Sequence, residues 1–188
     1  HPEHRHRRPY RYRDHHQILM SFLFPQETFI PPKILFKKGA FDGLAQEALE
    51  FGPCGILVHG HSFENSGSKE KIRKTFEAMR GVVDFFCRKN GEPCLNEISE
   101  VIERGRKIHT QWIAGIGGGS ALDLAKAAAG LFFTKEKPVY YQEGGMLQEK
   151  GVPFIAVPTT AGSGSEATLN AVIINPEKKV KIGRASCR

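Results

Sequence analysis

Two segments of this sequence place glycines and hydroxyl side chains directly after an apolar run. The first reads WIAGIGGGSALDLAK over residues 112–126, and the second reads PFIAVPTTAGSGSEAT over residues 153–168. Glycine has no Cβ atom, so an anion can approach the backbone closely, and the first N–H groups of a helix have no acceptor within that helix. Since the helix N-terminus also carries partial positive charge, such turns favour a bound phosphate.

The first turn has two possible interpretations. Its three glycines, residues 117–119, precede a helix predicted over residues 121–133, with Ser120 as the predicted N-cap. In the functional interpretation the glycines hold a phosphate. In the structural alternative the turn is simply tight, Asp123 closes a capping box with Ser120, and Asp123 pairs with Lys126 one turn later. This turn alone leaves both interpretations open.

The second segment repeats the same design. Thr159, Thr160, Ser163 and Ser165 offer hydroxyl donors for phosphate or ribose, and the two glycines between them permit close backbone approach. The alternative is an ordinary polar loop in which Ser163 and Glu166 form a capping box. Two such loops at one edge of a sheet favour a nucleotide site.

The elements that must position these loops alternate between strand and helix. Apolar runs predict strands at 54–60, 82–87, 112–116, 139–142, 154–158 and 170–175. Helical spacing predicts helices at 41–51, 69–81, 95–109 with Asn96 as a cap, and 121–133. This alternation predicts an α/β fold with a Rossmann-like, doubly wound and mostly parallel sheet. The loops after Gly60, Ile116 and Val157 would then share the carboxyl edge of the sheet, where ligands bind.

Charge separates the ends of the chain from its interior. The net charge is +7, but residues 17–177 carry 17 basic and 18 acidic side chains, so the excess belongs to the two ends. We expect residues 1–20 to be a non-native or disordered, His-rich basic extension. The final letters KIGRASCR match one reading frame of a sequencing adapter, which predicts an artefactual tail at 184–188. The predicted domain is therefore 21–183, and nucleic-acid binding has only these ends in its favour.

The remaining composition favours a soluble protein of the cytoplasm. Its four cysteines show neither C-x-x-C spacing nor a dense framework, which indicates free thiols in a reducing compartment. We find no apolar run of membrane-spanning length and no signal peptide pattern, so no membrane partner is expected. The sequence also has no Walker motif of an ATPase and no G-x-S-x-G motif of a serine hydrolase.

Both motifs resemble those of the iron-containing alcohol dehydrogenases, whose fold is close to glycerol dehydrogenase and dehydroquinate synthase. GIGGGSALDLAK is similar to the family segment G-G-G-S-x-x-D-x-x-K, and PTTAGSGSEAT is similar to P-T-T-A-G-T-G-S-E-x-T, with Ser163 where Thr is usual. PPKILFKKGAFDGL resembles the opening strand of the family, and NPEKKVKIG resembles the continuation past the second loop. The resemblance spans roughly residues 21–183.

The resemblance implies an N-terminal NAD(P)-binding half of an oxidoreductase that interconverts an alcohol with an aldehyde or ketone. The implied cofactor contacts, all read from the family motifs, are Gly117, Gly118, Gly119 and Ser120 at the pyrophosphate, Asp123 near the nicotinamide, Thr159 and Thr160 near the adenine, and Ser165 and Lys181 near the ribose and phosphates. It also implies a homo-oligomer for the full-length enzyme, with a small alcohol or aldehyde as the substrate.

The resemblance further implies that iron or zinc is held by one aspartate and three histidines of a C-terminal all-helical half. That half is absent from this sequence, and the interior histidines, His59, His61 and His109, form no D-x-x-x-H or H-x-x-x-H pair. We therefore expect no catalytic residue and no metal ligand within the chain. A stand-alone nucleotide-binding module and a fragment of a dehydroquinate synthase-like lyase are the alternatives.

The loop after the first strand bears on the choice between NADP and NAD. NAD enzymes usually set a carboxylate at such a strand end, where it binds the ribose 2′-hydroxyl and repels a 2′-phosphate. Here Gly60, His61 and Ser62 stand instead, which resembles the loop of NADP-using family members. Gly60 and Ser62 are therefore predicted cofactor contacts, and at least equal use of NADPH is expected. In the alternative, Glu64 folds back and takes the role of the carboxylate.

Overall fold

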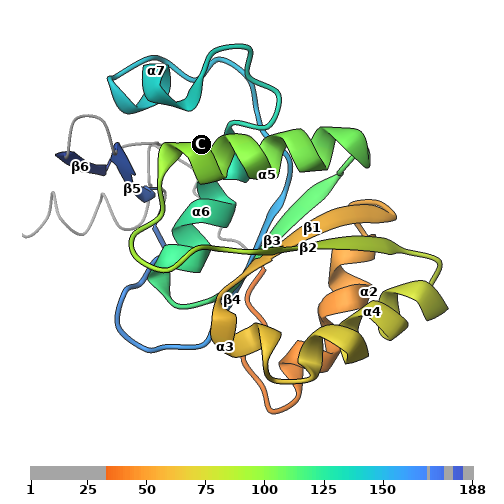
Figure 1. Cartoon of the computed structure of the whole chain (residues 1–188). Helices are drawn as coiled ribbons and strands as arrows, with labels where there is room; N and C mark the ends of the chain where they lie inside the picture. The colour runs from red at the N-terminus through yellow and green to blue at the C-terminus, as the bar shows by residue number, and fades with distance from the viewer. Residues whose placement is uncertain (1–32, 169, 176–179, 184–188) are drawn as a thin grey trace, which may run out of the picture. The chain divides into compact units, whose positions relative to one another are not determined.

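A computed structural model of the chain describes residues 33–168, 170–175 and 180–183 (Figure 1). The chain divides into two compact units, residues 1–37 and 38–188, and the second contains every helix and strand of the described part. The predicted extension at 1–20 and the predicted tail at 184–188 lie outside the described residues. The domain boundaries drawn from the sequence therefore stay a prediction.

The centre of the second unit is a four-stranded sheet. Its strands are β1 (Cys54–His59), β2 (Val82–Cys87), β3 (Trp112–Gly117) and β4 (Phe154–Pro158). They lie in the order β2-β1-β3-β4, and every neighbouring pair is parallel. The order moves outward from β1 in both directions, which is the doubly wound arrangement. The predicted α/β, Rossmann-like fold class is therefore confirmed.

Helices cover both faces of this sheet. Figure 1 shows α5 and α6 on one face and α2 and α4 on the other. The helical segments are η1 (Ala40–Gly43), α2 (Leu44–Leu49), α3 (His61–Glu64), α4 (Ser68–Ala78), α5 (Leu95–Lys107), α6 (Gly119–Gly130) and α7 (Pro138–Gln142). None of these described helices is both long and apolar enough to cross a membrane.

The apolar run of β1 divides its side chains between two cores, because successive residues of a strand face opposite sides. Ile56 and Val58 belong to the core beneath α5 and α6. Leu57 belongs to the core beneath α2 and α4, where Trp112 stacks on Phe76 with ring centroids 5.3 Å apart. All five side chains are almost completely buried. A strand covered on both faces must be apolar throughout, which is why β1 reads as a continuous run.

A second, two-stranded sheet follows the second motif. Its strands β5 (Val172–Asn175) and β6 (Val180–Gly183) pair antiparallel. The N–H group of Ile174 donates to the carbonyl of Pro93, which attaches β5 to the loop before α5. The predicted strand at 170–175 is therefore confirmed, although it does not join the central sheet.

One predicted strand is wrong. Residues 139–142 form part of helix α7 instead of a strand. Pro138 occupies the first turn of that helix, where its missing N–H group costs nothing and its fixed φ angle suits a helix. The Gln142 side chain then donates to the carbonyl of Ile173, so a tertiary contact fixes the segment. Short apolar runs cannot be assigned to helix or strand by periodicity alone.

Two predicted helix caps are also wrong. Cys94, not Asn96, caps α5, and the Glu97 carboxylate accepts a hydrogen bond from the Cys94 N–H group. The N-cap of α6 is Gly118 rather than Ser120, so Ser120 already lies within the first turn. Ser120 therefore forms no capping box with Asp123. The glycine turn is two residues shorter than the sequence pattern predicts, which brings the helix N-terminus closer to the sheet edge.

Candidate functional site

Three loops meet at the carboxyl edge of the central sheet. They follow β1, β3 and β4, whose last residues are His59, Gly117 and Pro158. The parallel register places His59 opposite Ile116 and Gly117 opposite Pro158, so the three strand ends are level. The prediction that these loops share one edge is confirmed.

The backbone of the glycine turn is shaped for the start of α6. Gly117 has φ +147°, a conformation that residues with side chains rarely adopt. Gly118 is extended, and its carbonyl accepts hydrogen bonds from the N–H groups of Ala121 and Leu122. By helix geometry the N–H groups of Gly119 and Ser120 have no acceptor within α6. These two donors are available to an anion at the helix N-terminus.

The second loop packs directly against this turn. The Thr159 N–H group donates to the Gly117 carbonyl over 2.9 Å. A Cβ atom added to Gly118 would lie 3.2 Å from the Thr160 hydroxyl oxygen, and one added to Gly119 would lie 3.1 Å from that of Ser165. The fold therefore brings the two motifs into one patch of backbone N–H and hydroxyl groups, the glycine patch.

Ser163 also belongs to this patch, although the predicted contacts omit it. A Cβ atom on Gly119 would lie 2.8 Å from the Ser163 Cβ atom, so no side chain fits at position 119 without displacing the loop. The Ser163 hydroxyl accepts a hydrogen bond from the Ser165 N–H group. The sequence signal that could have placed Ser163 among the predicted contacts is its position in the motif beside the other hydroxyl residues.

Asp123 is buried and already engaged by protein groups. One carboxylate oxygen lies 3.4 Å from Lys126 Nζ, and the other accepts a hydrogen bond from the Val172 N–H group over 3.1 Å. Lys126 Nζ also donates to the Thr168 hydroxyl and to the Asn170 carbonyl. The predicted Asp123–Lys126 pair is confirmed, and it ties α6 to the segment that follows the second loop.

The remaining predicted contacts lie in two other places. Gly60 is the N-cap of α3, with ordinary extended backbone, and Ser62 lies exposed in that short helix. Lys181 lies in β6 opposite Ile174, away from the central sheet. The Lys181 side chain is outside the described part, so its predicted contact with the ribose and phosphates stays a prediction.

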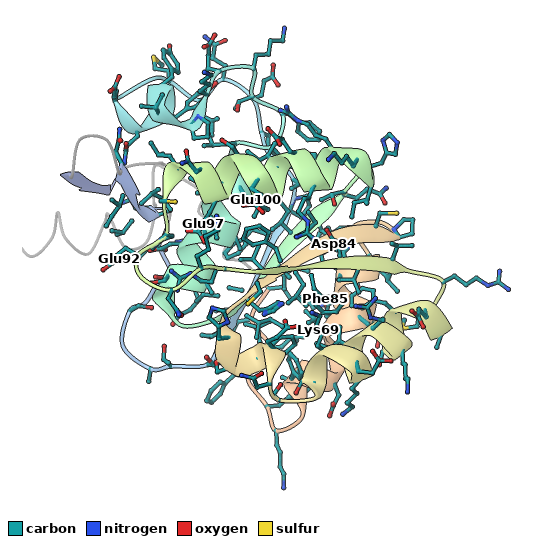
Figure 2. The ribbon with its side chains drawn as sticks, in the orientation of Figure 1. Lys69, Asp84, Phe85, Glu92, Glu97 and Glu100 are labelled. Carbon is teal, nitrogen blue, oxygen red and sulfur yellow. The ribbon has the colours of Figure 1, made fainter. Side chains whose placement is uncertain are left out.

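A second polar cluster lies beside Gly60 and was not predicted. His59 is completely buried at the end of β1, and its Nε2 atom lies 3.3 Å from a carboxylate oxygen of Glu64. The other Glu64 oxygen accepts a hydrogen bond from Lys69 Nζ, which also lies over the Phe85 ring (Figure 2). Cys87 ends β2 and faces His59 in the parallel register.

The surroundings of this cluster shift three pKa values. Burial lowers the pKa of the His59 imidazole below its ordinary value, so the ring tends to be neutral. The hydrogen bond from Lys69 lowers the pKa of the Glu64 carboxyl, which keeps it ionised. Burial raises the pKa of the Cys87 thiol, so free thiolate is disfavoured.

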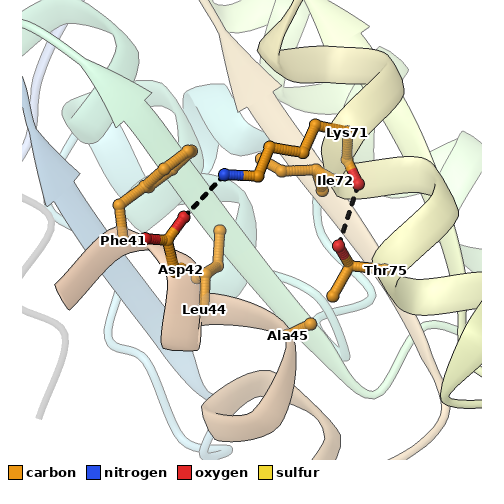
Figure 3. Close-up of a pocket in the computed structure, with 7 residues that line it drawn as sticks. All are labelled: Phe41, Asp42, Leu44, Ala45, Lys71, Ile72 and Thr75. Atoms are coloured by element: carbon orange, nitrogen blue, oxygen red, sulfur yellow. Dashed lines mark hydrogen bonds and ion pairs between the residues drawn. The ribbon is translucent and has the colours of Figure 1, made fainter. Parts of the chain in front are cut away.

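A separate pocket of about 290 Å³ lies between η1, α2 and α4 (Figure 3). Lys71 and Asp42 form an exposed ion pair across its mouth over 2.8 Å, and the Thr75 hydroxyl donates to the Lys71 carbonyl. No predicted cofactor contact lines this pocket. We therefore place the candidate cofactor site at the two glycine loops and not at this pocket.

The described unit is thus one parallel, doubly wound α/β domain whose ligand edge is built from two glycine and hydroxyl loops. The sequence model of the family described as iron-containing alcohol dehydrogenase matches residues 31–187. The chain belongs to this family.

Comparison with individual relatives shows how much of them the chain spans. It is 34% identical over 152 residues to the probable alcohol dehydrogenase EutG of Salmonella typhimurium, covering 79% of this chain and 38% of that protein. It is 29% identical over 155 residues to an NAD-dependent methanol dehydrogenase of Bacillus methanolicus, covering 82% and 41%. The chain therefore spans about 40% of the length of these relatives.

A solved structure has the same fold over the same portion. The sulfoacetaldehyde reductase of Bifidobacterium kashiwanohense, in complex with NAD+, superposes with a TM-score of 0.75 at 32% identity. The match covers 85% of this chain and 43% of that protein.

Proposed function

We propose that this chain is the cofactor-binding half of a metal-dependent oxidoreductase that interconverts an alcohol and an aldehyde or ketone with NAD(P). One observation carries the proposal: the loops after β3 and β4 meet at the N-terminus of α6, where Gly118 and Gly119 face Thr160 and Ser165. Membership in the iron-containing alcohol dehydrogenase family and the NAD+ complex of a structural neighbour support it.

The residues present fit a dinucleotide. The donors of Gly119 and Ser120 would hold the pyrophosphate, because they are unpaired in the helix and lie at its positive end. The closeness of Gly119 to Ser163 explains why no side chain occupies that position. Thr159 and Thr160 would face the adenine side, Ser165 and Lys181 the ribose and phosphates, and Asp123 the nicotinamide side, where Lys126 neutralises its charge.

Hydride acceptance by the bound nicotinamide is the chemistry that NAD(P) supplies. Iron or zinc would supply the polarisation of the alcohol oxygen, and by the family resemblance its ligands would lie outside the residues of this chain. The chain itself would position the dinucleotide through the backbone N–H and hydroxyl groups of the glycine patch. We further propose a cytoplasmic homo-oligomer without nucleic-acid or membrane partners, which the free thiols of Cys54, Cys87 and Cys94 support.

Expression of the complete coding sequence tests this function. We expect the product to oxidise primary alcohols with NAD(P)+ only when Fe²⁺ or Zn²⁺ is supplied, since the metal lowers the pKa of the alcohol. Residues 1–188 alone should bind NAD(P)H, as measured by the change in nicotinamide fluorescence. They should turn over no alcohol. Steady turnover by residues 1–188 alone, or no turnover by the metal-loaded complete product, would contradict the proposal.

Cofactor choice gives a further prediction at Gly60. We propose at least equal use of NADPH, because the ion pair with Lys69 offsets the negative charge of Glu64 and residues 60–62 carry no carboxylate that would repel a 2′-phosphate. A Cβ atom on Gly60 would meet no atom within 4 Å, so Gly60→Asp should fold normally and shift the kcat/KM preference towards NADH. Gly43→Asp, at an equally open glycine outside the predicted cofactor contacts, is the control. A strong NADH preference that Glu64→Ala abolishes would show that Glu64 acts as the ribose carboxylate.

A further inference from the structure

Three side chains with metal-ligating atoms gather at the carboxyl ends of β1 and β2, outside the glycine patch. His59, Glu64 and Cys87 each offer one ligand atom, and these atoms all lie within 4.8 Å of one another. They come from the last residue of β1, the last residue of α3 and the last residue of β2. Imidazole, carboxylate and thiolate together form a donor set that suits zinc and similar divalent cations.

The hydrogen bonding of His59 leaves its inner nitrogen without a proton. Nδ1 lies 3.1 Å from the Gly60 carbonyl, which can only accept, so Nδ1 carries the proton and the neutral ring presents a lone pair at Nε2. Nε2 is fully buried and makes no hydrogen bond among the described residues. This is the usual arrangement of a metal-binding histidine, whose second nitrogen donates to a backbone carbonyl.

The partner that faces this lone pair is another acceptor. A Glu64 oxygen lies 3.3 Å from Nε2, and the Glu64 carboxyl is held ionised because its other oxygen binds Lys69. His59 Nε2 is buried, whereas the Glu64 side chain is 37% exposed, so the two electron-rich atoms meet at the edge of the core, where a cation between them would offset their repulsion. A metal ion would satisfy both atoms.

One separation in the group already matches a tetrahedral zinc site. Usual zinc bond lengths predict edges of about 3.4 Å between nitrogen and oxygen ligands. The His59–Glu64 separation is 3.3 Å, and the Cys87 sulfur lies within 4.8 Å of both atoms, so a small side-chain movement would complete the three ligands. The exposed His61 lies outside this group but places its Nδ1 atom 3.6 Å from Cys87 Sγ, and it could take the fourth position by rotating its side chain. Lys69 would remain on the outer oxygen of Glu64 as an outer-sphere partner.

We propose that His59, Glu64 and Cys87, with His61 as the fourth ligand, bind a divalent cation of the zinc class. Binding converts the Cys87 thiol to a thiolate and releases its proton to solvent, so the dication is balanced by two anionic ligands. This metal site does not depend on the proposed function. Because Gly60 lies between His59 and His61, occupancy would also fix the loop that faces the cofactor.

Cobalt is the probe for this site, since Co²⁺ takes the same ligands and reports thiolate bonding by a near-ultraviolet charge-transfer absorption. Any Co²⁺ held by the histidines of residues 1–16 would give no thiolate signal. We expect titration of the full chain with Co²⁺, without nucleotide, to produce this absorption with saturation at one equivalent of thiolate-bound metal. Added Zn²⁺ should remove it.

Matched variants identify the thiol and the carboxylate. Cys87→Ser should abolish the absorption, whereas Cys54→Ser, at the opposite end of β1, should keep it. Glu64→Gln, at an exposed side chain that does not endanger folding, should weaken Co²⁺ binding by about 10- to 100-fold. Circular dichroism checks that each variant is folded. No thiolate absorption in the unmodified chain, or an unchanged one in folded Cys87→Ser, would overturn the proposal.

Discussion

Replacing Gly118 by valine is expected to weaken NAD(P)H binding by about 10- to 150-fold, the loss that follows when one charge-assisted hydrogen bond is removed. The branched side chain would stand between the α6 N-terminus and the pyrophosphate. It would also press on Thr160, whose hydroxyl oxygen would lie 3.2 Å from the new Cβ atom. Nicotinamide fluorescence titration of the full chain measures the effect.

The backbone conformation makes Gly118→Val a test of binding and not of folding. Gly118 has φ −80° and ψ −177°, a conformation that β-branched residues adopt readily. Gly43→Val, outside both glycine motifs and with no atom within 4 Å of the added Cβ, is the control and should bind NAD(P)H normally. An unaltered affinity in Gly118→Val would mean that the turn is structural only.

The sequence predicts the sheet edge well because its signals there are local. Each of the three loops follows an apolar run, and parallel strands must end at a common edge whatever their order. The contact between Gly118 and Thr160 could therefore be inferred from residues about 40 positions apart. Within the turn the prediction failed at Ser120, because serine and glycine both serve as N-caps and only the backbone geometry decides between them.

The polar cluster at His59 could not be predicted from the sequence, because its members meet only in the folded chain. His59 and Cys87 face each other only because β1 and β2 are neighbours in register, which no local pattern encodes. Glu64 joins them because residues 61–64 form a short helix where the sequence indicates a loop. Searches for ligands by spacing along one helix miss such a set, since its members come from two strands and a turn.

The buried pair of α6 gives the largest expected effect on stability. Lys126 is only 4% exposed and Asp123 only 7%, and Lys126 also donates to the Asn170 carbonyl over 2.7 Å. Lys126→Met keeps the volume of the side chain but leaves the Asp123 carboxylate buried without its cation. Breaking such a pair from one side costs about 3–5 kcal/mol, so the free energy of unfolding in urea should fall by this amount.

Two further variants separate the buried charge from other causes. Lys71→Met makes the same substitution at the exposed pair with Asp42, where the cost should stay below about 1 kcal/mol. The double variant Asp123→Asn, Lys126→Met should be more stable than Lys126→Met alone, because an amide still accepts the hydrogen bond from the Val172 N–H group without burying a charge. If Lys126→Met costs no more than Lys71→Met, the pair does not hold the segment after the second loop against α6.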